Sequence, residues 1–257
     1  MKKRVSIAAQ MMSVVFLFLL VNGCNPNAKK AKVILGDDTL NTGTIHISVD
    51  ESFAPIMDSQ IKVFMSQNPK AKIIPHYKPE ADCLKDMLSD STRMVIVTRG
   101  LMEDEIPFYK DTIGFVPIYG RIATDAIAVI THNKAKDSLF SVADIRSMLN
   151  GTSGYTYQLV MDGLKATSTV RFLIDSVLRG QPLNGKVMAS TSSEGVIDYV
   201  ASNPNAIGFI GVSWIGNRED PSQMSFQKRV RLAALQCSRC EEEVFVRPYQ
   251  ANIALKR

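Results

Sequence analysis

Strand-like and helix-like segments alternate along the first third of the chain, and this alternation limits the possible folds more than any other feature. Residues 44–49 alternate and are rich in β-branched side chains, which predicts a strand. Residues 56–67 carry apolar side chains at helical spacing. A strand at 71–75, a helix at 81–88 and a strand at 94–97 follow. The order predicts a parallel sheet with helices on its faces.

A second unit of the same kind follows in the sequence. We expect strands at 122–130, 159–161, 186–188 and 206–212, with helices at 141–149, 168–178 and 193–201. The helix at 141–149 has Ser141 at its start and Asn150-Gly151 at its end, which are typical capping residues. The 233 residues after Cys24 are enough for two modest domains or one large one.

The N-terminal segment has the parts of an export signal. It begins Met1-Lys-Lys-Arg, continues with an apolar run over residues 14–21 and ends in Asn-Gly-Cys24. Residues 21–24 resemble the lipobox of bacterial lipoproteins, which implies a signal peptide at 1–23, lipid on Cys24 and a tether at 24–42. A transmembrane helix is the alternative, but it needs about 20 apolar residues and this run is shorter. We expect lipid anchoring in the cell envelope, on its periplasmic side or at the cell surface.

Composition excludes several classes of function. Lys2, Lys3 and Arg4 belong to the signal, so the remaining chain has 27 basic and 25 acidic residues, and nucleic acid is not an expected partner. His46, His76 and His132 are scattered without ligand spacing, so we expect no metal and no cofactor. Cys237 and Cys240 lie between two strand-like runs, which favours a small structural disulfide or two unreactive thiols at a hairpin end.

Three turns that follow predicted strands carry the candidate binding groups. Ligands of open parallel sheets sit beyond the carboxyl ends of the strands, where helices begin. Hydroxyl groups, free backbone N–H groups and guanidinium groups at such positions suit a tetrahedral oxyanion. The candidates in these turns are Ser52 and Phe53, then Thr98 and Arg99, then Thr167, Ser168, Thr169 and Arg171.

These turns and two further segments resemble one known family. The segments are DESFAPI (50–56), VTRGL (97–101), ATDAIA (123–128), TSTVRFLIDS (167–176) and AIGFIGVSW (206–214). In this order they are similar to the phosphate-binding proteins of bacterial phosphate ABC transporters. The resemblance implies a type II periplasmic-binding-protein fold, in which each lobe is a mostly parallel sheet flanked by helices and two hinge strands join the lobes.

The resemblance also implies a function and a division into lobes. It places residues 43–122 and 208–257 in lobe 1 and residues 123–207 in lobe 2, with crossings near 121–125 and 206–211. It implies a non-enzymatic, monomeric protein that captures phosphate between the lobes and delivers it to an ABC permease. Family members accept a phosphate proton on an Asp near the third-strand loop. Here that loop reads Thr98-Arg99, so the acceptor is Asp50, Glu51 or Asp125.

Two alternatives to phosphate capture remain open at the level of the sequence. The same fold could bind another oxyanion, such as sulfate or molybdate. The chain could also be a surface lipoprotein that uses its lobes as an interaction module and binds no ligand.

Overall fold

The computed structural model describes residues 39–89, 91–163 and 167–256. Residues 1–38 are outside the described part, so the expected signal peptide, the expected lipid attachment at Cys24 and most of the expected tether lie outside it. None of the helices in the described ranges is long and apolar enough to cross a membrane.

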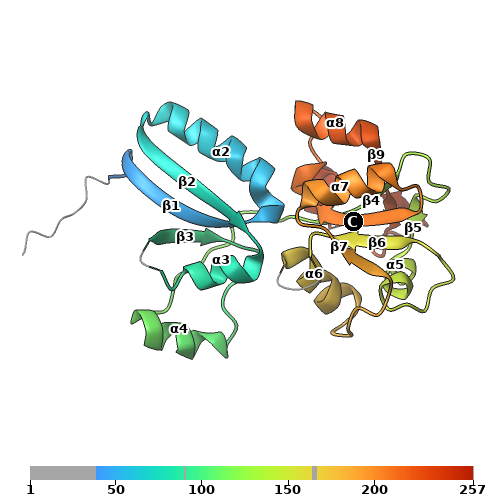
Figure 1. The fold of residues 1–257 in the computed structure, drawn as a ribbon, viewed down its shortest axis with the longest axis horizontal. Coiled ribbons are helices and arrows are strands. Elements are labelled where there is room, and N and C mark those ends of the chain that lie inside the picture. Colours follow the sequence, from blue (N-terminus) through green and yellow to red (C-terminus); the bar gives the residue numbers. More distant parts are fainter. Residues whose placement is uncertain (1–38, 90, 164–166, 257) are drawn as a thin grey trace, which may run out of the picture. The chain divides into compact units, whose positions relative to one another are not determined.

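The first lobe is a three-stranded parallel sheet with helices on both faces (Figure 1). Its strand order is β2-β1-β3. On one face, Ile47 and Val49 of β1 pack against Ile61 of α2. The elements are β1 (Thr42–Asp50), η1 (Glu51–Phe53), α2 (Ala54–Gln67), β2 (Lys70–Lys78), α3 (Glu80–Asp86), β3 (Thr92–Ile96) and α4 (Glu105–Ile113).

The second lobe is built on a five-stranded mixed sheet of order β7-β6-β8-β4-β9. Strands β6, β7 and β8 are parallel, whereas β4 is antiparallel to β8 and β9. The elements are β4 (Ile127–His132), β5 (Leu139–Phe140), α5 (Val142–Leu149), β6 (Gln158–Met161), α6 (Ser168–Phe172), the π-helical turn η2 (Leu173–Val177), β7 (Val187–Ala189), α7 (Ser193–Ser202), β8 (Ala206–Gly211), η3 (Val212–Trp214), α8 (Pro221–Arg229), β9 (Val230–Leu232), β10 (Ala234–Gln236), β11 (Phe245–Val246) and α9 (Gln250–Ala254).

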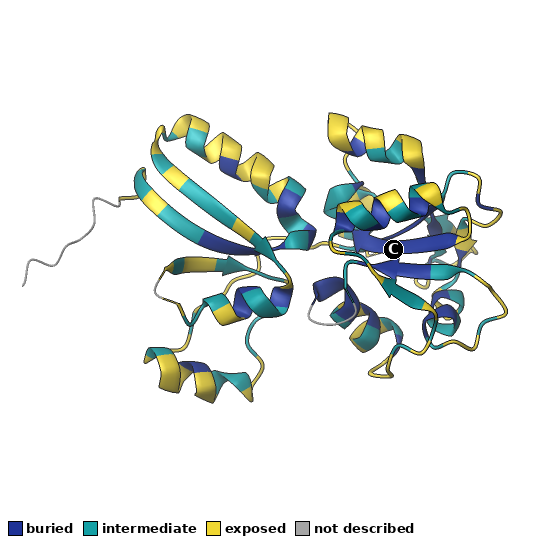
Figure 2. Cartoon of the chain, viewed as in Figure 1, coloured by how far each residue is buried: buried dark blue, intermediate teal, exposed yellow. Residues whose placement is uncertain are grey.

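The second sheet has an apolar core on each face. One core includes Leu149, Leu173 and Phe209, and the other includes Ile130, Ile197 and Ile210. Figure 2 shows the central strands of this sheet as buried, while the strands of the first lobe are more exposed. A disulfide joins Cys237, directly after β10, to Cys240 in the loop that leads to β11, which agrees with the expected small disulfide at a hairpin end.

The chain passes from the first sheet to the second through residues 114–126, which include the first expected crossing at 121–125. These residues are in neither a helix nor a strand. The expected strand at 122–130 begins only at Ile127, where pairing with Gly211 of β8 begins.

The C-terminal part of the chain differs from the expected division into lobes. Residues 206–211 form β8 in the interior of the five-stranded sheet instead of a second crossing strand. Strand β9 pairs with β4, and β10 pairs with β5, so residues 208–257 are not returned to the first sheet as the family resemblance implied. The physical reason is that the apolar strands after β8 find their partners within the second lobe.

Candidate functional site

The carboxyl ends of parallel strands from both lobes meet at one place. Strand β1 ends at Asp50, and Ser52 follows it in the short helix η1. In the second lobe, β6 ends at Met161, and Ser168 is the first residue of α6. The hydroxyl oxygens of Ser52 and Ser168 are 3.2 Å apart, although the residues are 116 positions apart in sequence. Both residues are buried, with exposed fractions of 2 % and 4 %.

Asp50 lies beside this pair of hydroxyl groups and has an unused acceptor. Its Oδ1 accepts the backbone N–H of Ser52 at 2.9 Å, an interaction that fixes the turn after β1. Its Oδ2 is buried without a hydrogen-bond partner in the described structure, and the residue is only 1 % exposed. Burial raises the pKa of this carboxyl above its usual value, against the opposing hydrogen bonds from the Ser52 backbone and from the hydroxyl groups of Ser168 and Ser52.

Gly211 allows the two lobes to approach each other next to Ser52. A Cβ at this position would lie 3.0 Å from the carbonyl oxygen of Ser52 and 3.2 Å from its Cβ. The hydroxyl group of Ser213 donates to that same carbonyl oxygen, and the Trp214 indole N–H donates to the carbonyl oxygen of Glu51 at 3.3 Å. The end of β8 is therefore a direct contact between the lobes.

Carboxylates of the chain hold several of the remaining hydroxyl and N–H groups. Asp162, which follows β6, accepts the hydroxyl groups of Thr167 at 3.1 Å and Thr169 at 3.3 Å. Glu51 of the first lobe accepts the backbone N–H of Ser193 at 3.0 Å and its hydroxyl at 2.7 Å. Glu51 thus satisfies a free N–H at the start of the ten-residue helix α7, where the helix dipole favours negative charge.

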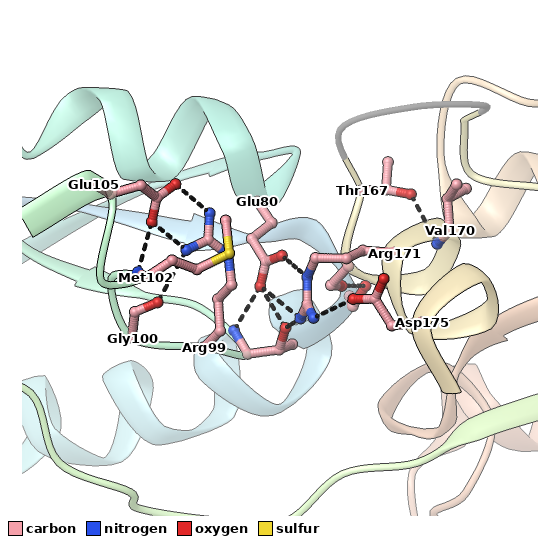
Figure 3. Close-up of polar contacts among 12 residues, drawn as sticks. Glu80, Arg99, Gly100, Met102, Glu105, Thr167, Val170, Arg171 and Asp175 are labelled. Carbon is pink, nitrogen blue, oxygen red and sulfur yellow. Dashed lines mark hydrogen bonds and ion pairs between the residues drawn. The ribbon is translucent and has the colours of Figure 1, made fainter. Parts of the chain in front are cut away.

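Glu80 is the first residue of α3, after β2, and its carboxylate binds the turn that follows β3. Its Oε1 accepts the backbone N–H of Thr98 at 3.0 Å and also the hydroxyl group of Thr98. Its Oε2 accepts Nε of Arg171 from the second lobe at 2.7 Å (Figure 3). Although burial by itself would raise the pKa of Glu80, the hydrogen bonds from Arg171 and Thr98 hold it below its usual value.

Arg99 is engaged within the first lobe. Its guanidinium group makes a two-pronged ion pair with Glu105 at 2.6 and 2.8 Å, and it also donates to the carbonyl oxygen of Gly100 (Figure 3). Phe53 packs against the apolar core of the first lobe. Within the described ranges, no hydrogen bond joins the side chain of Arg99 to Ser52 or Ser168.

Four carboxyl groups around the site have raised pKa values. Burial is the largest cause for each, and it raises the pKa of Asp162 to about 7 and that of Asp125 to about 6. Neighbouring charges add to the effect: Glu51 and Asp50 for Asp162, and Asp50 for Asp125. The pKa of Glu51 is raised too, against the opposing hydrogen bonds from Ser193. Such a cluster favours ligands that donate protons to carboxylates.

A small cavity of about 90 Å³ lies between the lobes next to Asp50. Residues from both lobes line it, namely Asp50, Glu51, Tyr77, Lys78, Pro79, Asp162, Thr167, Thr191 and Ser192. A volume of this size holds roughly three water molecules at about 30 Å³ each. No group of three or more His, Cys, Asp or Glu side chains suited to a metal ion occurs in the described ranges.

The sequence analysis did not identify Glu80, Asp162 or Ser193. Asp162 directly follows β6, Glu80 comes shortly after β2, and Ser193 comes shortly after β7. This position was the available signal, because the carboxyl ends of strands were already the expected place of the site. Two of the three are acidic, and an acidic side chain near a helix start is ordinarily a cap.

Two α/β lobes with a polar site between their facing strand ends define a ligand-binding protein of the two-lobe type. Residues 37–257 match the family model described as the PBP superfamily domain, so the chain belongs to this superfamily of binding proteins. The periplasmic-binding-protein type II fold expected from the sequence is thereby confirmed.

Solved structures agree with this fold at low sequence identity. A putative phosphate ABC transporter substrate-binding protein with bound phosphate from Clostridium perfringens is 19% identical, with a TM-score of 0.58 over 75% of this chain and 76% of that chain. An ABC-type phosphate transport receptor from Vibrio cholerae is 15% identical, with a TM-score of 0.52 over 83% and 82%.

A regulatory domain has the same fold. The CcmR regulatory domain of Synechocystis PCC6803 in complex with 2-PG is 11% identical, with a TM-score of 0.54 over 76% of this chain and 81% of that chain. No curated protein matches this chain significantly. At these identities the likeness shows the fold alone.

Proposed function

We propose that the protein captures inorganic phosphate between its two lobes, without catalysis, and delivers it to an ABC importer. It is anchored to the membrane through lipid on Cys24 and acts in the cell envelope. The observation that carries the proposal is the meeting of Ser52 and Ser168 from opposite lobes beside the unused Oδ2 of Asp50. Two solved structures of similar fold carry phosphate-transport names, which supports the choice of ligand.

The chemistry of these three residues suits a protonated oxyanion. The hydroxyl groups of Ser52 and Ser168 donate to ligand oxygens, and one helix start in each lobe holds them in place. Asp50 Oδ2 accepts a proton that hydrogen phosphate carries and that sulfate lacks at neutral pH. The hydroxyl groups of Thr167 and Thr169 donate to Asp162 in this structure. When the ligand also donates a proton to Asp162, these hydroxyl groups become further donors to the ligand.

Titration calorimetry of the purified protein with phosphate, sulfate and molybdate tests the proposal. Ser168→Ala should weaken phosphate binding about ten-fold or more, because a hydrogen bond to a charged group is worth about 1.5–3 kcal/mol. Ser59→Ala is the matched control, since Ser59 is exposed on α2 and its hydroxyl donates to the carbonyl oxygen of Pro55.

The role of Asp50 has its own variant. Asp50→Asn replaces an acceptor oxygen with an N–H donor, so the preference for phosphate over sulfate should fall at least ten-fold. Absence of binding heat with all three oxyanions would refute the proposed function. Tighter binding of sulfate or molybdate than phosphate would assign the same site to a different oxyanion.

A further inference from the structure

The negative charge of Glu80 lies at Thr98 and Arg171, the residues that the sequence analysis expected to donate to the ligand. Its carboxylate holds the N–H and hydroxyl of Thr98 and the guanidinium of Arg171. The side chain of Glu80 is 4 % exposed, so water does not supply its hydrogen bonds. Glu80 and Arg171 lie 91 positions apart in sequence and belong to different lobes (Figure 3).

Arg171 has no charge left over for a ligand. Its Nε and Nη2 donate to Glu80 at 2.7 and 3.4 Å, its Nη1 donates to Asp175 at 3.4 Å, and its Nη2 also donates to the Thr98 hydroxyl at 2.5 Å. Arg99 is neutralised in the same way by Glu105. Both arginines of the candidate turns are therefore paired with carboxylates of the chain.

The rest of the site adds carboxyl groups. Asp50, Glu51 and Asp162 line the cavity between the lobes, and the one cationic side chain in its lining, Lys78, is paired with Asp86 at 2.5 Å. A fully ionised anion in this cavity, beside Asp50, would meet these carboxyl groups and no unpaired cation of the lining. An oxyanion with its own O–H groups would instead donate to these carboxylates.

We propose that Glu80 is a specificity-determining residue of the cleft: by neutralising Arg171 across the lobes, it makes the site select oxyanions by their protons instead of by their full negative charge. The inference rests on the proposed phosphate-binding function and adds to it the residue that sets selectivity. Removing the Glu80 charge frees the Arg171 guanidinium, which is a strong donor for a fully ionised tetrahedral anion. Sulfate then gains affinity relative to phosphate.

The test is the ratio of sulfate to phosphate affinity, measured by calorimetry at neutral pH in the wild type and in Glu80→Gln. The Gln side chain keeps an oxygen for the Thr98 N–H while it removes the charge. We expect the ratio to rise at least ten-fold in favour of sulfate. Glu105→Gln is the matched control, because it breaks an Arg–Glu pair inside the first lobe and should leave the ratio unchanged.

The double variant Glu80→Gln/Arg171→Gln covers the case in which the single variant does not fold. It removes both charges of the pair, and its ratio should stay within three-fold of the wild type. An unchanged ratio in a folded Glu80→Gln, or an equal rise in Glu105→Gln, would overturn the inference while phosphate binding by the wild type stands. A ten-fold rise in the double variant would overturn it as well. Absence of oxyanion binding in the wild type would instead reject the proposed function and this inference with it.

Discussion

Asp162 should make the protein less stable as the pH rises from 5 to 8. Its pKa lies at about 7 in the folded protein, against an ordinary value of 3.8, because it is buried near Glu51 and Asp50. The folded state therefore binds more protons than the unfolded state between these values, and stability falls as pH rises through this window. The sign is opposite to that of an ordinary salt-bridged carboxylate.

The magnitude follows from the difference in pKa. At about 1.36 kcal/mol per pKa unit, the linkage relation gives a loss of about 2.5 kcal/mol from this one group between pH 5 and pH 8. Asp125, with a pKa of about 6, acts in the same direction over the lower part of the range. Glu80 and Glu105 act oppositely, but their pKa values lie below the usual 4.5, so they contribute little above pH 5.

Urea unfolding at pH 5 and pH 8 measures the effect. Asp162→Asn removes the titrating group while its amide oxygen still accepts a threonine hydroxyl. We expect the pH 5-to-8 loss of stability in this variant to be smaller than in the wild type by about 1–3 kcal/mol. Asp104→Asn, an exposed position at the start of α4, is the control. A loss in Asp162→Asn equal to that of the wild type would refute the reasoning.

Two further predictions concern other parts of the chain. Gly211→Ala places a Cβ 3.0 Å from the Ser52 carbonyl oxygen, so thermal unfolding should show a loss of about 1–3 kcal/mol together with weaker phosphate binding; an unaltered melting curve would contradict this close approach. Cys24→Ser should move the protein from the membrane fraction to the soluble fraction of cells and abolish labelling by a radioactive fatty acid. Continued labelling of the variant would exclude Cys24 as the lipidated residue.

Most helices and strands could be predicted because their patterns are local. The strands at 44–49 and 71–75 and the helix at 56–67 need only alternation, helical spacing and a stop at Asn68-Pro69. The helix α4 (Glu105–Ile113) carries Pro107 in its first turn and only one buried side chain, Tyr109, so its apolar pattern is weak. Helix α8 (Pro221–Arg229) is mostly polar and was missed for the same reason.

The ends of strands that depend on pairing with segments far away in the sequence were harder to predict. Residues 122–126 look as strand-like as the residues after them, but the neighbouring strand β8 begins to pair only with Ile127. The assignment of residues 208–257 to the first lobe came from family resemblance, and strand β9 pairs instead with β4. Strand partners lie far away in sequence, so no local pattern specifies them.

The candidate site was predictable in position but not in its pairing. Ser52 and Ser168 were expected to lie at the ligand site because each follows the carboxyl end of a strand, β1 in the first sheet and β6 in the second. That Arg171 meets Glu80 depends on the packing of two lobes against each other. The sequence analysis treated Arg99 and Arg171 as free cations, because a sequence does not show which carboxylate lies nearest to each.

The connection through residues 114–126 has a consequence for ligand affinity. Within the described ranges this stretch alone links the two sheets, and it contains no regular secondary structure. Two parallel connecting strands would restrict relative motion of the lobes to bending about one axis, whereas a single connection also permits torsion. The rotational entropy lost when the lobes close is then subtracted from the free energy of ligand binding. A covalent cross-link engineered between the lobes in their closed arrangement would return that entropy as tighter binding.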